Sequence, residues 1–243
     1  MKDTTGQSVS GETYLECERW RGFLLLMFVA GFYGAFTYSI RGGIFCNAQT
    51  ANFVLFAMAL GNEDWGQALY LLIPISAYFL GAVLSEFLPN TVKSFGTIRW
   101  DTLLIGCEMI VVVFLGLLPE SAPVQISQVT INFICSMQYN TFRQASGIPM
   151  ATTFCTNHLR QVGIAFTRAV KHKDLGYLDR LIRHGGMLFV FVVGGIISTI
   201  LCRLFLGKAI FAALIPLGIL LADLLYADLK KEKGSLDRIP RGH

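Results

Sequence analysis

The chain has 243 residues, of which 53% are hydrophobic and only 15% are charged. A soluble domain of this length normally carries about 25% charged residues, so the composition excludes an ordinary soluble domain and favours an integral membrane protein. The net charge of +4 indicates no nucleic-acid partner, because the basic residues flank apolar segments, where they face anionic lipid. We expect one membrane domain over residues 19–229, between an N-terminal segment, 1–18, and a basic tail, 230–243.

Six apolar blocks follow one another along the chain. Each is long enough, or nearly so, to cross about 30 Å of hydrocarbon as a helix. The expected fold class is therefore an all-α membrane protein with six transmembrane helices. The blocks are 21–40, 67–88, 101–118, 126–146, 186–206 and 209–227.

The first and fourth blocks each run into a polar stretch that breaks or rehydrates a helix. The two stretches are Arg41–Asn52 and Arg143–His158, and shorter apolar pieces, 51–60 and 159–170, follow the breaks. Irregular backbone at membrane depth is tolerated only where protein buries it or where it lines a cavity. Paired breaks in the two halves of a membrane protein are typical of a transport site.

The breaks suggest that the chain is a repeat of three helices plus three, with halves over about 21–118 and 126–227. An odd number of crossings per half would insert the second copy upside down. Two weak similarities support this: Phe45-Cys46 matches Phe154-Cys155, and Gly81 and Gly194 begin small-residue faces that let helices approach closely. The alternative is chance, because glycine and alanine are common in membrane helices.

The distribution of Lys and Arg predicts that both termini are cytoplasmic and that the protein is a multi-pass protein of the cell membrane. With the N-terminus inside, the outer turns 61–65 and 119–123 are acidic and lack Lys and Arg. The segment Lys171–Gly185 has leucines at helical spacing between basic residues. We expect it to lie on the inner membrane surface as an amphipathic helix.

Two stretches resemble the signatures of the YoaK family, also called DUF1275. Residues Gly31–Asn52 (GFYGAFTYSIRGGIFCNAQTAN) resemble the first, and Met137–Arg143 (MQYNTFR) with Ala151–Arg160 (ATTFCTNHLR) resemble the second. The resemblance extends from about Arg19 to Leu229. It implies a six-helix membrane protein and supplies no established activity.

The chain departs from the family pattern at four positions. The resemblance implies an Asp where Gly34 stands, so an acidic group of the first helix is missing. It also implies Thr-Gly-Asn at both breaks, where this chain has Ala51 in the first and Asn157 and His158 in the second. A proton or cation role of the missing Asp would be lost here or carried by another residue.

The first break carries a dense polar cluster that we interpret as substrate-binding. A helix beginning near Thr50 would direct its positive N-terminal end at a solute, which favours an anion. The alternative is that Thr50 or Asn52 only caps that helix, although capping does not explain the whole cluster. Its members are Arg41, Asn47, Gln49, Thr50 and Asn52.

The second break carries the matching cluster. His158 titrates near neutral pH and is a candidate for coupling a proton to transport. The alternative is a neutral histidine satisfied by hydrogen bonds. The expected substrate-binding residues here are Gln138, Arg143, Thr152, Thr153, Thr156, Asn157 and His158.

Three charged residues complete the candidate site. Arg41 and Arg143 lead into the breaks and offer planar donors to a carboxylate or phosphate, unless they snorkel to the interface. Glu108 lies inside the third apolar block. Its charged form needs a nearby cation, for which either arginine is the expected partner. A proton-coupling role and a structural ion pair both remain open for Glu108.

These patterns predict a small secondary transporter or channel for a small polar or anionic solute, with its site where the broken helices meet near the membrane midplane. The alternative is a lipid-binding or scaffold membrane protein that transports nothing. No nucleophile–base motif or metal-ligand spacing is visible in the sequence, so we expect no enzyme activity, no cofactor and no metal. The expected partners are membrane lipid and the solute, and six helices are few for a lone transporter, which favours a homodimer.

Overall fold

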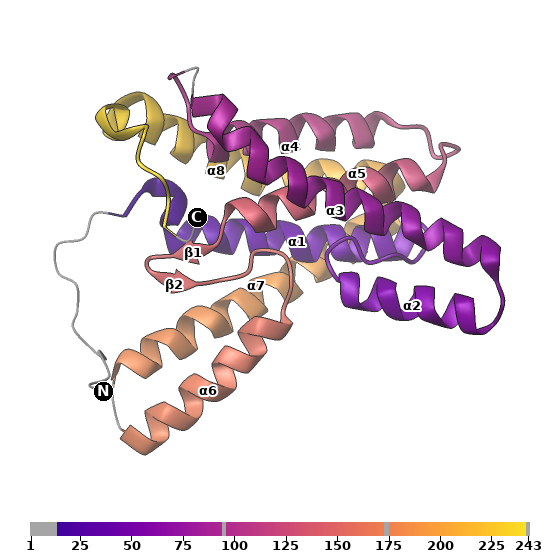
Figure 1. Ribbon diagram of the computed structural model, residues 1–243, viewed down its shortest axis with the longest axis horizontal. Coiled ribbons are helices and arrows are strands. Elements are labelled where there is room, and N and C mark those ends of the chain that lie inside the picture. The colour runs from indigo at the N-terminus through magenta and orange to yellow at the C-terminus, as the bar shows by residue number, and fades with distance from the viewer. Residues whose placement is uncertain (1–13, 94–95, 173–174, 242–243) are drawn as a thin grey trace.

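The computed structural model describes residues 14–93, 96–172 and 175–241 (Figure 1). Helices dominate it, and the one strand pair in the described residues is a hairpin of two residues per strand, β1 (Gln144–Ala145) and β2 (Ile148–Pro149). Short 3-10 or π segments cover Glu16–Glu18, Leu206–Ala213, Ala227–Lys231 and Lys233–Ser235. The α-helices are α1 (Trp20–Ile40), α2 (Gln49–Gly61), α3 (Trp65–Lys93), α4 (Trp100–Leu117), α5 (Val124–Thr141), α6 (Thr156–His172), α7 (Leu175–Phe205) and α8 (Leu214–Tyr226).

Four stretches of the described chain are long and apolar enough to cross a membrane. They are α1, α3 as far as Pro89, α4, and a continuous stretch from Gly176 to Lys231 that holds both α7 and α8. This length and composition indicate a helical membrane protein. The expected span at 126–146 is helical as α5, but it is not among these stretches because it carries amides such as Gln128, Asn132 and Gln138.

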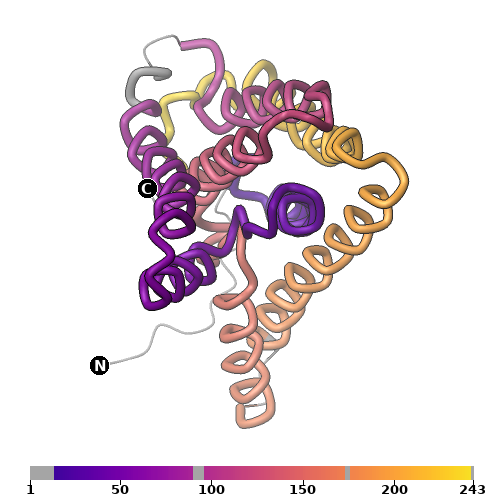
Figure 2. The backbone as a smooth tube through the Cα atoms, turned by 90° about the vertical axis from the view of Figure 1, so that its right-hand side faces the viewer, coloured from indigo at the N-terminus to yellow at the C-terminus, as the bar shows by residue number. Residues whose placement is uncertain are grey.

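Helix α1 lies at the centre of the bundle. Figure 2 looks along it and shows other helices around it. Its side chains from Phe23 to Phe36 are apolar on all faces, and most of them are fully buried. A helix that is apolar all round is stable only when other elements cover it. The central position of α1 therefore follows from its sequence.

Two helix pairs approach closely enough that only glycine fits between them. A Cβ atom built on Gly194 of α7 would lie 2.1 Å from the carbonyl oxygen of Phe28 in α1. A Cβ atom on Gly81 of α3 would lie 2.4 Å from the carbonyl oxygen of Phe133 in α5. The prediction that Gly81 and Gly194 mark close helix contacts is confirmed, and the physical reason is the absent side chain.

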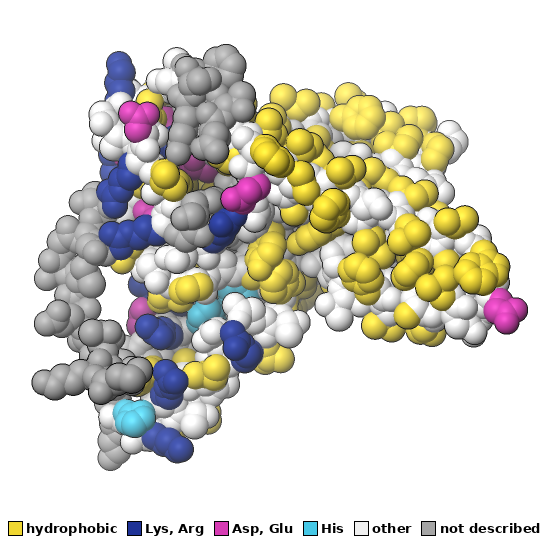
Figure 3. All heavy atoms as spheres, viewed as in Figure 1, with side chains coloured by type: hydrophobic (Ala, Val, Ile, Leu, Met, Phe, Trp, Pro, Cys, Tyr) yellow, Lys and Arg dark blue, Asp and Glu magenta, His cyan; other side chains and the backbone are white. Residues whose placement is uncertain are grey.

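Charged side chains gather at one end of the bundle, and apolar side chains cover most of the remaining surface in Figure 3. The two described ends of the chain meet at the charged end. The backbone N–H of Arg241 donates to Glu18 at 2.7 Å, and the Arg241 guanidinium lies 5.0 Å from the ring centre of Tyr14. The N-terminal segment and the C-terminal tail therefore share one side of the molecule.

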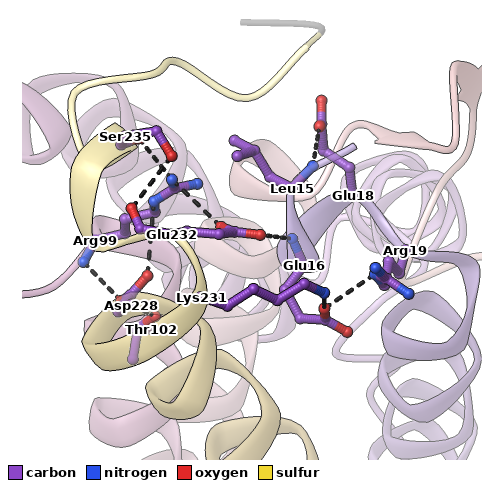
Figure 4. A network of polar contacts seen from close by, with 10 residues as sticks. All are labelled: Leu15, Glu16, Glu18, Arg19, Arg99, Thr102, Asp228, Lys231, Glu232 and Ser235. Carbon is purple, nitrogen blue, oxygen red and sulfur yellow. Dashed lines mark hydrogen bonds and ion pairs between the residues drawn. The ribbon is translucent and has the colours of Figure 1, made fainter. Parts of the chain in front are cut away.

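A polar network holds this end together (Figure 4). Asp228 accepts hydrogen bonds from the backbone of Arg99 at 2.9 Å and from the Thr102 hydroxyl at 2.6 Å. The buried Arg99 guanidinium pairs with Asp228 and, at 3.3 Å, with Glu232. Glu232 in turn accepts from the backbone of Glu16. The network joins the start of α4 to both terminal segments.

The segment Lys171–Gly185, expected to be an amphipathic helix on the inner membrane surface, is helical over most of its length. Residues 173–174 lie outside the described residues, and from Leu175 onward the segment is the beginning of α7, which continues to Phe205. At Gly186 the helix packs closely on Trp20, whose ring would lie 3.0 Å from a Cβ at that position.

Candidate functional site

The first break is a reversal of the chain directly after α1. Gly42 and Gly43 have positive φ angles of 84° and 71°, a region that glycine enters without steric penalty. The chain then runs back beside α1, so that the Asn47 amide donates to the carbonyl of Ala30 at 2.9 Å. Gly34 leaves the space for Asn47, whose side chain would lie 3.2 Å from a Cβ at that position.

Helix α2 begins at the inner end of this reversal without a side-chain cap. Its N-cap residue is Ala48, and no side chain bonds the first N–H groups. The alternative that Thr50 or Asn52 caps the helix is therefore wrong. Asn52 instead donates to the carbonyl of Phe45 at 2.8 Å, and Gln49 donates to Asn132 of α5 at 2.7 Å, while Thr50 is exposed.

The second break contains the hairpin, which was not expected from the sequence. Ser146 and Gly147 at its turn have positive φ angles of 49° and 77°, as in hairpin turns that match the strand twist. The Ser146 N–H donates to the carbonyl of Glu18 at 2.7 Å. The hairpin therefore docks the second break onto the N-terminal segment.

Beyond the hairpin, the second break buries polar side chains that find few partners. Thr152 and Thr153 are fully buried, and neither hydroxyl makes a hydrogen bond of ordinary geometry in the described chain. The Gln138 amide donates to the carbonyl of Thr152 at 3.2 Å, while its own oxygen stays unpaired. Buried polar atoms are normally satisfied, so these unpaired oxygens are the candidates at the second break for contact with a polar guest.

His158 is buried at the start of α6 and is fixed from both ring nitrogens. Its Nε2 lies 2.8 Å from the carbonyl oxygen of Ala151, and its Nδ1 lies 2.9 Å from Nδ1 of His184 in α7. A carbonyl only accepts, so His158 Nε2 carries a proton, and in the neutral pair His184 donates to His158. His184 is also buried, with 2% of its side chain exposed. No spacing rule links two histidines on different helices, so this pair could not be predicted from the sequence.

Two other expected site residues lie at the edge of the second break. Thr156 is exposed at the start of α6. Asn157 is partly buried and accepts a hydrogen bond from Arg160 at 3.0 Å. These two residues do not join the buried hydroxyls of the same break.

The expected pairing of Glu108 with an arginine is wrong. Arg41 is buried at the far end of α1 and pairs with Glu120 at 3.5 Å. Arg143 pairs with Glu86 at 2.8 Å, at the other end of the bundle. The reason is geometric: each arginine follows the end of its helix, whereas Glu108 lies within α4.

Glu108 faces the hydroxyl of Tyr33, and Tyr33 lies near the first break. Glu108 is fully buried, and neither of its oxygens has a hydrogen bond of ordinary geometry in the described chain. Tyr33 interacts with Glu108 and with the thiols of Cys46, in the first break, and Cys135, in α5. These groups therefore extend from α4 to the first break.

Glu108, Tyr33, Cys46 and Cys135 form a row of polar groups, and Tyr78 of α3 extends this row toward the second break. It lies beside Thr153 and interacts with the Cys135 and Cys46 thiols. Tyr78 therefore lies near Cys46 of the first break and Thr153 of the second. Sequence reasoning missed Tyr33 and Tyr78, although a tyrosine inside an apolar helix was the available signal.

Two cavities open around Arg143. One, of about 410 Å³, lies between the ends of α3, α4 and α5 and the C-terminal tail, and Arg99, Thr141 and Arg241 line it. The other, of about 480 Å³, is lined by Met150, Ala151, Phe154 and Asn157 of the second break and the start of α6. Both cavities touch the second break, and neither touches the first. Within the described part of the chain, no cluster of three His, Cys, Asp or Glu side chains could hold a metal ion.

Cys17 is buried in the wall of the first of these cavities. Burial raises the pKa of its thiol well above the usual range, and the nearby Asp101 carboxylate raises it further. A thiol with a raised pKa stays protonated and unreactive at neutral pH. Cys17 is therefore a packing residue of the charged end of the bundle.

Comparison with known proteins gives one match. The family model described as "Protein of unknown function (DUF1275)" matches residues 22–222, a stretch that runs from the first turn of α1 into α8 and includes both breaks. No curated protein and no solved structure matches the chain. The chain belongs to the DUF1275 family.

Proposed function

We propose that this protein is a small carrier or channel that moves a small polar solute across the cell membrane, through the region where the two breaks meet. Irregular backbone within a membrane domain needs a functional reason, because lipid offers no hydrogen bonds. In this chain two such segments converge on one buried row of polar side chains. The helices α2 and α6 that follow the breaks would be re-entrant half-helices.

The helix contacts support an inverted repeat of three helices plus three. In the proposed correspondence α1 matches α5, α2 matches α6, and α3 matches α7. The contacts obey this exchange: α1 packs on α7 as α5 packs on α3, and α2 packs on α3 as α6 packs on α7. Gly81 and Gly194 occupy matching places at the two closest contacts. In such repeats the substrate lies between the halves near the membrane midplane.

The charged end of the bundle is the proposed cytoplasmic side, with both termini on it. Lys and Arg favour the cytoplasmic face, and the described terminal segments meet at that end. Both cavities would then open toward the cytoplasm. At the opposite end, the buried Arg41 and the loop residue Glu120 would close the outer side.

The unpaired buried oxygens at the breaks carry the proposal. Leaving a buried polar group without a partner costs about 1–3 kcal/mol, and a chain selected only to pack would replace such groups by apolar ones. A passing solute supplies the missing partners. The oxygens belong to Asn52, Gln138, Thr152 and Thr153.

Solute uptake into proteoliposomes tests the proposal directly. We expect uptake of at least one solute from a panel of neutral, cationic and anionic compounds. The double variant Thr152→Val, Thr153→Val should reduce that uptake by about tenfold, equivalent to about 1.4 kcal/mol of lost interaction. Thr167→Val is the matched control, because this hydroxyl bonds its own helix at Gly163 and is exposed. Folded protein that moves no solute of the panel would contradict the proposal.

One observation favours the alternative of a lipid-binding or scaffold protein without transport. Several amides of the breaks are already bonded to protein groups, as with Asn47 to Ala30 and Gln49 to Asn132. A buried centre whose polar groups were all hydrogen-bonded within the protein would need no bound solute. The same uptake panel separates the two functions. If flux is found, Glu108 and His158 are the candidates for coupling a proton to it.

A further inference from the structure

The charges of the candidate site lie in a different arrangement from the one that an anionic solute requires. Arg41 and Arg143, the two cations expected to attract an anion, lie at opposite ends of the bundle, and each is paired with a glutamate. In the buried centre, the carboxyl of Glu108 faces Tyr33 and no Lys, Arg or His among the described residues. The ionisable group at the centre is therefore an acid and not a base.

The unpaired polar atoms at the centre are all oxygens. The amide nitrogens of Asn52 and Gln138 are used, because they donate to the carbonyls of Phe45 and Thr152. What remains is a set of acceptors, of which the hydroxyls can also donate. These unpaired oxygens belong to Tyr33, Asn52, Glu108, Ser136, Gln138, Thr152 and Thr153.

The helix N-termini at the breaks carry partial positive charge and would favour an anion. Their effect is weaker than that of a full charge. The uncapped start of α2 presents about half a positive charge, and its effect falls off within one turn. An ionised Glu108 carries a full charge in a buried place, where an unpaired carboxylate is strongly disfavoured. A cationic guest removes that penalty, whereas an anionic guest would increase it.

The spacing of the acceptors favours an organic cation over a bare ion. A bare divalent cation needs several oxygens, carboxylates among them, around one point, and the described residues contain no cluster of three His, Cys, Asp or Glu side chains. Here the acceptors extend from Glu108 and Tyr33, past Cys46 and Cys135, to Thr153. A molecule with a charged head and a polar body matches such a row.

From this geometry we infer that the solute is a small protonated amine, whose ammonium group is held by Glu108 and Tyr33 and whose polar body contacts the threonines of the second break. This inference rests on the proposed transport function for its route but not for its binding site. The ammonium donors would satisfy both oxygens of the carboxylate as charge-assisted hydrogen bonds. Glu108 would thus be the specificity-determining residue.

Binding to the full-length protein in lipid nanodiscs tests the inference without requiring transport. The probes are methylammonium and ethanolamine, with glycerol, acetate, sodium chloride and potassium chloride as the other arms. We expect an amine to bind saturably. Loss of a charge-assisted hydrogen-bond partner should weaken this binding about tenfold or more in Glu108→Gln and a few-fold in Tyr33→Phe. The control is Glu63→Gln, an exposed carboxyl in the turn before α3.

The outcomes separate this inference from the proposed function. If amine binding depends on Glu108 but no flux occurs in proteoliposomes, the inference is supported and transport is contradicted. If a neutral or anionic solute shows equal flux in wild type and Glu108→Gln, transport is supported and the inference is overturned. Binding of no amine, a response to alkali ions alone, or equal amine binding in wild type and Glu108→Gln would also overturn it. If Glu108→Gln does not fold, Tyr33→Phe and the shortened Glu108→Asp supply the same comparison.

Discussion

His158 of α6 and His184 of α7 are hydrogen-bonded to each other inside the protein, with 2.9 Å between their Nδ1 atoms. The bond fixes the start of the half-helix α6 to the long helix α7. It also orients the second break, because the other nitrogen of His158 holds the carbonyl of Ala151 at 2.8 Å. A pair of rings at this distance accommodates at most one additional proton, since two positive charges would repel.

The first prediction concerns this pair. His158→Gln and His184→Gln should each lower the free energy of unfolding by about 1–3 kcal/mol, because each disrupts the hydrogen bond of a buried partner. The double variant should cost less than the sum, with a coupling of about 1 kcal/mol. Chemical unfolding in detergent measures all three. His172→Gln, at an exposed position, should change stability by less than about 0.5 kcal/mol. Additive effects at 158 and 184 would contradict the pairing.

The second prediction concerns the network at the charged end. Asp228→Ala should lower the free energy of unfolding by about 3–5 kcal/mol, because it removes a buried counter-charge of Arg99. Asp179→Ala is the matched control. Its partner Arg183 lies one turn away on the surface of α7, where such a pair contributes about 0.3–0.5 kcal/mol. Similar losses of unfolding free energy in the two variants would show that the Asp228 contacts contribute no more than a surface ion pair.

The third prediction concerns the close helix contacts. Gly194→Ala and Gly81→Ala should each destabilise the protein by about 1–3 kcal/mol, because the new methyl group forces two backbones apart. Gly106→Ala is the control, since nothing lies within 4 Å of a Cβ at that position in α4. It should be neutral or stabilise the helix by up to about 1 kcal/mol. Thermal unfolding of the three variants side by side checks the order.

The fourth prediction concerns Cys17. In a protein that keeps Cys17 alone among its cysteines, a maleimide should label the folded state slowly at neutral pH, because burial raises the thiol pKa and little thiolate forms. Labelling should accelerate as the pH rises and after unfolding. Asp101→Asn should increase the rate at a given pH, because the Asp101 carboxylate also raises the Cys17 pKa. Rapid labelling of folded protein at neutral pH would contradict the burial of this thiol.

The fifth prediction concerns orientation. In a cysteine-free background, Glu63→Cys should react with a membrane-impermeant maleimide added outside intact cells. Asp237→Cys should react only after the cells are opened. Both positions are exposed in the structure, so access would depend on the side of the membrane alone. The reverse pattern would place the charged end outside.

Local features of the fold were predictable from the sequence. Apolar blocks of sufficient length become helices whatever surrounds them, because lipid leaves the backbone no other partner. The break after α1 was predictable because Gly42 and Gly43 adopt backbone angles that interrupt a helix. The glycine contacts were predictable because Gly81 and Gly194 stand among other small residues.

Partner choices were not predictable in the same way. The sequence placed Arg41, Arg143 and Glu108 in one region, whereas the structure separates all three. Ion-pair partners depend on how far each residue lies along its helix and on which helices are neighbours. The hairpin of the second break also escaped prediction, because four strand residues leave almost no periodic signal and are held by contact with Glu18.

By itself, the sequence determined that this chain is a membrane protein with two polar breaks, because hydrophobicity, charge and glycine content act locally along the chain. Only the tertiary structure decided that His158 meets His184 and that Tyr33 faces Glu108. It also decided that Tyr78 lies near residues of both breaks, Cys46 and Thr153. These contacts join residues of different helices, and the packing of α6 against α7 brings the two histidines together.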